Sequence, residues 1–166
     1  FFKKGEKHGE GTFSEYDENG RLLSKYTGQY NMGKRHGQGS FFQYDSKGLV
    51  VKKYLGEFTN DAMTGEGVLF TYNSNGILSS KYIGQIVDGV PGGEGTMFIY
   101  DKSGVLIAKN SGLFKNGLLN GEGYSITYDS SGKPNRRING IWSDGVLQEN
   151  KAALNGDGDS YSGEWV

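Results

Sequence analysis

The sequence predicts an all-β chain, built as a tandem array of antiparallel hairpins. Its glycines return at a fixed interval of 28 residues, as in the column Gly28, Gly56, Gly84, Gly112 and Gly140. Large and polar residues alternate between these glycines, as expected of strands, and no stretch has helical periodicity. A fixed interval of this length is typical of one supersecondary unit stacked on copies of itself. Such arrays present extended surfaces, so the pattern favours binding or scaffolding over catalysis.

Residues 26–53 serve as the reference unit. Residues 26–30 (Tyr-Thr-Gly-Gln-Tyr) alternate in the strand period and are expected to form the first strand. Residues 33–37 (Gly-Lys-Arg-His-Gly) form a polar segment bounded by glycine and are predicted to be a hairpin loop. Residues 39–44 follow as the second strand, so each repeat is expected to be one hairpin.

A second turn is predicted at residues 45–48 (Asp-Ser-Lys-Gly). The aspartate side chain there can accept hydrogen bonds from nearby backbone N–H groups, and the glycine can take a positive φ. Residues 49–53 then lead into the first strand of the next repeat, so the chain should run up and down through successive strands. Counterparts of the two turn residues are Asp17, Asn73, Asp101 and Asp129, and Gly20, Gly76, Gly104 and Gly132.

Glycine inside a strand costs about 0.5–1 kcal/mol relative to alanine, so its regular use needs a packing reason. We expect Gly28, Gly37 and Gly39 to leave a shallow track that receives the ring of Tyr30. The counterparts of this ring are Phe58, Ile86, Phe114 and Trp142. Because large side chains contribute most to a core, this column is predicted to be buried.

The run Tyr26-x-Gly28-x-Tyr30-x-x-Gly33-x-x-x-Gly37-x-Gly39 resembles the MORN repeat, the membrane occupation and recognition nexus motif. Residues 161–165 (Tyr-Ser-Gly-Glu-Trp) resemble its start. The repeats here are longer than most in the family, and the added residues lie around the second turn. The resemblance implies an elongated, curled single antiparallel sheet. It also implies a scaffold that dimerises or contacts cytoskeletal or membrane-associated partners, sometimes beside a catalytic domain.

The whole chain, 1–166, is expected to be one array. Both ends fall inside a repeat, so we expect a fragment of a longer protein, and Asp61, Asn110 and Ile138 depart from the pattern. The predicted repeats lie at about 1–25, 26–53, 54–81, 82–109 and 110–137, followed by a degenerate repeat at 138–160 and the start of another at 161–166.

One column is basic in every repeat: Lys25, Lys53, Lys81, Lys109 and Arg137. Two strands per repeat would space these charges by roughly 10 Å along one edge of the sheet. Such a stripe could bind anions, and acidic phospholipids such as phosphoinositides are the expected ligand. The alternative is that these residues pair with cross-strand carboxylates and only solvate the sheet. The carboxylates considered are Glu10, Glu66, Glu94 and Glu122.

A second column is aromatic: Tyr16, Tyr44, Tyr72, Tyr100 and Tyr128. The last four follow two residues after Phe42, Phe70, Phe98 and Ile126, and by alternation the column lies on the face opposite Phe41, Leu69 and Met97. We expect internal packing for the phenylalanine row. The tyrosine row is expected to be partly exposed and is the candidate surface for a protein partner or self-association.

Composition excludes several classes of function. The net charge of −1 gives no global basis for nucleic-acid binding, and the chain has no cysteine for disulfides or thiolate metal sites. His8 and His36 occupy equivalent positions but are expected to be exposed loop residues rather than metal ligands. Residues 155–159 (Asn-Gly-Asp-Gly-Asp) hint at a calcium loop, yet Ser160 and Val166 stand where glycine and glutamate are required.

The sequence therefore predicts a non-catalytic scaffold or protein-interaction module, with no cofactor, metal or small-molecule substrate. A peripheral membrane module that binds acidic phospholipids through the basic column is the alternative. A carbohydrate-binding repeat is a third interpretation. No apolar run reaches the roughly 20 residues that a membrane-spanning helix needs, and we expect a cytoplasmic location, with contact to membrane or cytoskeleton as a further option.

Overall fold

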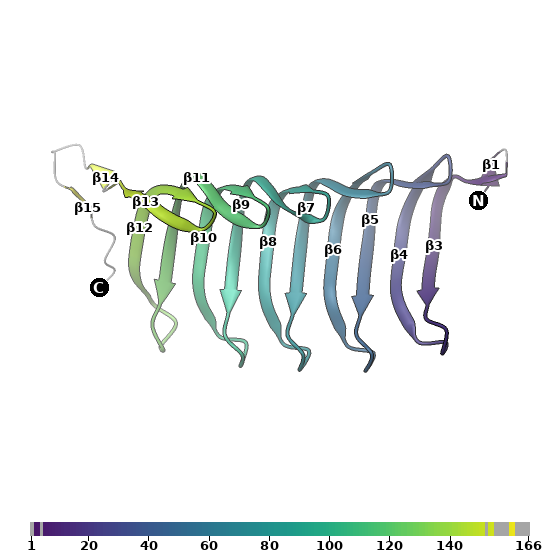
Figure 1. Ribbon diagram of the computed structural model, residues 1–166, viewed down its shortest axis with the longest axis horizontal. Helices are drawn as coiled ribbons and strands as arrows, with labels where there is room; N and C mark the ends of the chain where they lie inside the picture. Colours follow the sequence, from purple (N-terminus) through teal and green to yellow (C-terminus); the bar gives the residue numbers. More distant parts are fainter. Residues whose placement is uncertain (1, 4, 152, 155–159, 162–166) are drawn as a thin grey trace.

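The computed structural model describes residues 2–3, 5–151, 153–154 and 160–161. Eleven antiparallel strands stand side by side in sequence order, from β3 at one end to β13 at the other (Figure 1). No helix occurs in these ranges, which confirms the all-β prediction. The strands are β3 (Gly9–Tyr16), β4 (Leu22–Asn31), β5 (Lys34–Tyr44), β6 (Val50–Thr59), β7 (Ala62–Tyr72), β8 (Leu78–Val87), β9 (Val90–Tyr100), β10 (Leu106–Lys115), β11 (Leu118–Tyr128), β12 (Pro134–Ser143) and β13 (Val146–Asn150).

Two strand pairs lie outside the main sheet. At one end β1 (Phe2–Lys3) pairs with β2 (Glu6–Lys7), and at the other β14 (Ala153–Leu154) pairs with β15 (Ser160–Tyr161). The predicted degenerate repeat at 138–160 is therefore described only in part. Residues 155–159, the calcium-like segment, lie outside the described ranges.

The turns at the upper edge of Figure 1 are shorter than the sequence predicts. Met32 and Gly33 alone connect β4 to β5, with φ of 51° and 79°. A two-residue hairpin with positive φ at both positions matches the right-handed twist of its strands. The prediction of a loop over residues 33–37 is wrong, because residues 34–37 already belong to β5.

The turns at the lower edge confirm the sequence prediction. In the turn after β5, the Oδ1 atom of Asp45 accepts hydrogen bonds from the N–H groups of Lys47 and Leu49, at 2.8 and 3.0 Å. Gly48 takes a φ of 83°. The carboxylate therefore replaces the backbone partners that a turn leaves unsatisfied. The same pair of bonds recurs at Asp17, Asn73, Asp101 and Asp129.

One unbroken row of glycines crosses the main sheet from β3 to β12. The register sets each glycine of this row directly opposite the next, strand after strand. We call it the glycine row: Gly11, Gly28, Gly39, Gly56, Gly67, Gly84, Gly95, Gly112, Gly123 and Gly140. Since no side chain separates neighbouring backbones there, large rings from the same face can lie over it.

A tyrosine ring covers the glycine row in three successive repeats. Tyr54 is fully buried, and its hydroxyl donates to the carbonyl oxygen of Glu57 at 2.7 Å. A Cβ added to Gly67 would lie 2.5 Å from a ring carbon of Tyr54, so the glycine is required sterically. Tyr26 lies over Gly39, and Tyr82 over Gly95, in the same way.

This arrangement corrects the predicted packing of the glycine track. The ring over Gly28 and Gly39 is Tyr26 rather than Tyr30, whose ring lies against Gly11 instead, at 3.1 Å from its projected Cβ. The nearest side chain to the projected Cβ of Gly37 is that of Gln29. The prediction that the Tyr30 column is buried is confirmed for its first four members: Tyr30, Phe58, Ile86 and Phe114 are at most 7% exposed, while Trp142 is half-buried against them.

The core lies on one face of the sheet and continues from repeat to repeat. Edge-to-face ring pairs join the repeats, with centroids 4.9 Å apart for Tyr26 and Phe58 and 5.1 Å for Tyr82 and Phe114. Such pairs contribute about 0.5–1.5 kcal/mol beyond the area they bury. We call this side the core face and the opposite side the outer face.

Backbone hydrogen bonds also join the short turns in series. The N–H of Gly33 donates to the carbonyl of Lys7, and that of Gly89 donates to the carbonyl of Met63, both at 2.9 Å. Equivalent bonds follow from Asp61, Gly117 and Gly145. Each turn is therefore held by the preceding hairpin, as expected when units contact only their neighbours.

Two departures from the repeat pattern have local consequences. Asp61 replaces glycine at a φ of 73°, and its carboxylate accepts the N–H of Arg35 at 2.8 Å. Asn110 replaces the core tyrosine, and its Oδ1 atom is buried without a hydrogen-bond partner. An unsatisfied buried acceptor of this kind costs about 1–3 kcal/mol, so the hairpin of β10 and β11 is weaker than its neighbours.

The contact between ring and glycine can be tested by a double-mutant cycle. Gly67→Ala should lower the free energy of unfolding by about 1–3 kcal/mol, because the added methyl group must displace the Tyr54 ring. In a Tyr54→Ala background the same change should cost less, since the obstructing ring is gone. Urea denaturation of the four proteins measures the coupling. Equal costs in both backgrounds would show that the ring does not require the glycine.

The buried tyrosines predict an alkaline loss of stability. Burial raises the pKa of Tyr26, Tyr54 and Tyr82 to about 12, from an ordinary value of 10.0. Between these values the unfolded chain has lost phenol protons that the folded chain retains. Stability should therefore be fully present below pH 10 and should fall as the pH rises from 10 to 12.

A variant separates this effect from general alkaline damage. Tyr54→Phe should cost about 1 kcal/mol at pH 7 through its lost hydrogen bond. It should also show a shallower decline between pH 10 and pH 12. Unfolding curves at fixed pH values across this window give both quantities. An unchanged slope in the variant would argue against the buried phenol as the cause.

Candidate interaction surface

The outer face carries a row in which basic and apolar residues alternate across the sheet. Lys53 of β6 lies directly opposite Phe42 of β5 on one side and Phe70 of β7 on the other. Lys81 likewise lies between Phe70 and Phe98. We call this the basic–aromatic row: Lys25, Phe42, Lys53, Phe70, Lys81, Phe98, Lys109, Ile126 and Arg137.

The register places the five predicted basic residues together, but in a different position from the one expected. They lie in a line across the interior of the strands rather than along an edge of the sheet. Their neighbours in the row, the phenylalanines, share the outer face with them and are half-buried. Phe41, by contrast, lies on the core face and packs against the buried cluster.

Three of the four lysines of the row lie close to rings rather than carboxylates. The Nζ atom of Lys53 lies 5.0 Å from the Phe70 ring centroid and 5.6 Å from that of Phe42. Lys81 and Lys109 lie 5.6 and 5.7 Å from the centroids of Phe70 and Phe98. Attraction between a cation and a ring at such sites contributes about 0.5–1 kcal/mol.

The alternative of pairing with cross-strand carboxylates is wrong for this row. Among the described residues the ion pairs are Arg21 with Asp17, Arg35 with Asp61, and Lys151 with Glu122, none of them in the row. The other glutamates considered for pairing are Glu10, Glu66 and Glu94, and each lies on its strand four residues before the position level with the row. At about 3.4 Å per residue this is roughly 14 Å away. The outer face thus carries two parallel stripes of opposite charge.

The predicted tyrosine column lies beside the basic–aromatic row, towards the longer turns. Each member is the last residue of its strand: Tyr16, Tyr44, Tyr72, Tyr100 and Tyr128. Tyr44 stacks with Phe42, with centroids 6.4 Å apart and planes at 15°. Tyr16 is 59% exposed, whereas the others are half-buried. Partial burial raises the pKa of Tyr72.

In three hairpins a polar side chain accepts a backbone N–H of the paired strand near the short turn. We call this hydrogen bond the clasp; sequence reasoning missed it. The Oε1 atom of Gln85 accepts the N–H of Glu94 at 2.9 Å. Gln29 and Glu57 do the same for Gln38 and Glu66. The bond occurs where the register of the two strands shifts. The first glycine of each G-x-G pair leaves room for this side chain.

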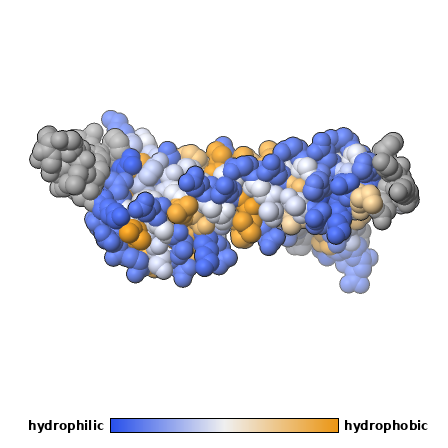
Figure 2. Space-filling model, turned by 90° about the horizontal axis from the view of Figure 1, so that it is seen from above, coloured by the Kyte–Doolittle hydropathy of each residue, from blue (hydrophilic) through white to orange (hydrophobic). Residues whose placement is uncertain are grey.

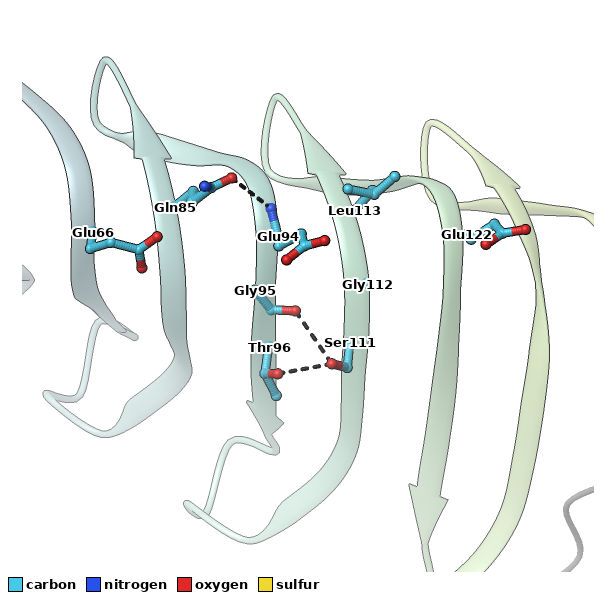
Figure 3. A pocket seen from close by; sticks show the side chains of 9 residues that line it. All are labelled: Glu66, Gln85, Glu94, Gly95, Thr96, Ser111, Gly112, Leu113 and Glu122. Carbon is cyan, nitrogen blue, oxygen red and sulfur yellow. Dashed lines mark hydrogen bonds between the residues drawn. The ribbon is translucent and has the colours of Figure 1, made fainter.

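A shallow hollow lies on the outer face, where Gln85 and three glutamates of neighbouring hairpins gather (Figure 3). Glu66, Glu94 and Glu122 point into the open from three neighbouring hairpins, and Thr96 bonds Ser111 below them at 2.9 Å. The described residues contain no group of three or more acidic, histidine or cysteine side chains arranged to hold a metal ion. The hollow is a polar surface shared by several repeats.

Both histidines line one shallow hollow at the start of the array. The Nδ1 atom of His36 accepts the N–H of Asn60 at 3.3 Å. Thr64 and Asn120 occupy the same position in other repeats and accept equivalent N–H groups through oxygen atoms. The side chain of His36 therefore has a structural role in satisfying the next short turn.

The molecule seen from above shows apolar residues as separate patches among hydrophilic ones (Figure 2). Leu55 and Ile83, which are 38% and 43% exposed, lie between the two charged stripes of the outer face. The described part of the chain has no helix that could cross a membrane.

Comparison with protein families supports the resemblance seen in the sequence. A profile of the MORN repeat matches residues 1–14, 26–45, 54–75, 82–103 and 111–129. A search of curated protein sequences gives no match. The matched segments take up more than half of the chain and coincide with the hairpins that the glycine row joins. MORN repeats are generally associated with protein and membrane interactions. The chain belongs to the MORN repeat family.

Proposed function

We propose that this chain is a non-catalytic scaffold that holds a partner protein, or a second copy of itself, on its outer face. The observation that carries the proposal is the basic–aromatic row, which runs in register over nine strands. Its cations are not neutralised by carboxylates among the described residues. Aromatic side chains are enriched at the centres of protein interfaces, and the tyrosine column extends this surface.

The geometry gives little support to catalysis. The Nδ1 atom of His36 already accepts a backbone N–H, that of Asn60. The carboxylates recur once per repeat, as a column, rather than as one acid–base pair. The hollows of the outer face are open and polar. Enzyme sites usually combine an enclosed apolar pocket with a few converging polar groups.

A peripheral membrane module is the second candidate, favoured by the same cations. Each basic side chain near an acidic bilayer contributes about 1 kcal/mol, so five in a line would give appreciable binding at low salt. In that case the protein would be cytoplasmic and peripheral to membrane. The stripe of Glu66, Glu94 and Glu122 on the same face opposes this reading, because a flat bilayer would meet it too.

The row should contribute little to folding. Neutralising Lys53, Lys81 or Lys109 to glutamine is expected to lower the free energy of unfolding by about 1 kcal/mol or less each, the size of an exposed cation–ring contact. Urea denaturation gives the values. Losses of several kcal/mol would mean that the cations are needed to hold the sheet, and would remove the main reason to assign them to binding.

A triple variant tests the interaction itself. Lys53→Gln, Lys81→Gln and Lys109→Gln together remove three charges from the row. Lys34→Gln, Lys47→Gln and Lys102→Gln remove the same charge from exposed residues near the turns. Flotation with neutral and phosphoinositide-containing vesicles, at low and physiological salt, separates the two candidates. Capture of protein partners from a lysate, quantified for each variant, completes the comparison.

The scaffold proposal expects the row variant, and not the control, to lose partner capture or self-association, with little vesicle binding by either protein. Salt-sensitive binding to acidic vesicles alone, lost in the row variant, would favour the membrane candidate. If both variants keep every interaction of the parent chain, the outer row is not the binding surface.

A further inference from the structure

The spacing of the basic–aromatic row restricts what can bind along it. Successive cations lie two strands apart, at about 9.6 Å, because neighbouring strands in a sheet are about 4.8 Å apart. From Lys25 to Arg137 there are four such intervals, or about 38 Å. An apolar side chain fills each interval: a half-buried phenylalanine in the first three, as Phe70 between Lys53 and Lys81, and the buried Ile126 in the last. A linear ligand that contacts every cation of the row must therefore present an anionic group about every 9.6 Å, with apolar groups between.

Only one regular backbone conformation matches this spacing closely. A polyproline II helix has three residues per turn and rises about 9.3 Å per turn, so it falls short by only about 1 Å over the row. In an α-helix, residues seven apart share a face and are separated by about 10.5 Å. Over the four intervals of the row, the mismatch with the cation spacing grows to about 4 Å. An extended strand repeats a face every second residue, at about 6.8 Å, and does not match.

The side chains of the row fit the chemistry of such a segment. Polyproline II helices usually dock on grooves lined by aromatic side chains, and their proline rings lie flat against the aromatic rings. Phe42 and Tyr44, stacked 6.4 Å apart, form a two-ring platform of this kind. The ammonium group of the neighbouring Lys53 lies near the Phe42 and Phe70 rings, where a carboxylate of the ligand could form an ion pair with it.

We propose that the outer face binds an acidic polyproline II segment, laid across the strands, with a carboxylate at every third position. Each carboxylate lies at one cation of the row, and the prolines between lie on Phe42, Phe70, Phe98 and the adjacent tyrosines. The inference rests on the proposed protein-interaction function and gives the partner its chemistry.

The charge distribution favours a slender chain over a flat acidic surface. Glu66, Glu94 and Glu122 run parallel to the row, roughly 14 Å away on the same face. A bilayer pressed against the face meets both stripes, and repulsion from the glutamates offsets attraction to the lysines. A single extended chain along the row contacts the cations alone.

Direct binding of a defined peptide tests the proposal. The probe is a fluorescent peptide of five Glu-Pro-Pro triplets, about 46 Å long in the polyproline II conformation. Fluorescence anisotropy with the full chain should show binding that weakens with salt. The Lys53, Lys81 and Lys109 glutamine variant should lose at least tenfold in affinity, whereas the matched variant at Lys34, Lys47 and Lys102 should stay within about twofold. Circular dichroism confirms that both variants are folded.

Three further peptides with five glutamates each isolate conformation and spacing. The first has the same composition with its glutamates consecutive, and the second is five Glu-Gly-Ser triplets, which are flexible. The third is an alanine-rich helix with a glutamate at every seventh position. Each should bind at least fivefold more weakly than the probe. Equal binding of all four would mean that the row senses only charge, and tighter binding of the helix would replace the proposed conformation; either result overturns the inference.

The two proposals fail in different ways. If no peptide binds, while partner capture still depends on the row, the acidic polyproline II segment is wrong and the scaffold function stands. If neither peptide binding nor partner capture depends on the row, both proposals fail. Loss of peptide binding in the matched control variant as well would place the peptide elsewhere and also contradict the inference.

Discussion

The contact between a buried tyrosine and the glycine row organises the rest of the sheet. The phenol needs a backbone without side chains beneath it, and its hydroxyl needs the carbonyl three residues further along the chain, as Tyr54 finds at Glu57. Both needs are met only when two strands are paired glycine to glycine. The same contact therefore fixes the register of each hairpin, and the register decides which residues share the outer face.

The sequence predicted the repeat unit and the longer turns because their signals are local. Asp45 and Gly48 lie within one turn, and their chemistry does not depend on any distant strand. The loop over residues 33–37 was mispredicted because polar residues and glycines indicate a loop in isolation. Here Gly37 has no side chain because the Gln29 side chain occupies that space. Only the pairing of the two strands brings Gln29 close to Gly37.

The candidate surface was predicted in part for the same reason. The basic column and the aromatic columns are each visible at the repeat interval, but their alternation is not. A two-residue turn at Met32–Gly33, continued without irregularity, would set Lys25 opposite Ser40. The register shift beside Gln29 sets it opposite Phe42 instead. A shift of this kind depends on the clasp by the side chain and has no simple signature in one sequence.

The hydrogen bonds between successive short turns have a mechanical consequence. Tension along the array acts across the strands, so the links from Gly33 to Lys7 and from Gly89 to Met63 share it in parallel with the strand pairs that join the same hairpins. Such a chain opens one unit at a time, at the force its weakest link withstands. The hairpin with Asn110 in place of tyrosine is the natural place for the first opening. The array would then lengthen in steps under load, while the repeats that remain folded keep their part of the binding surface.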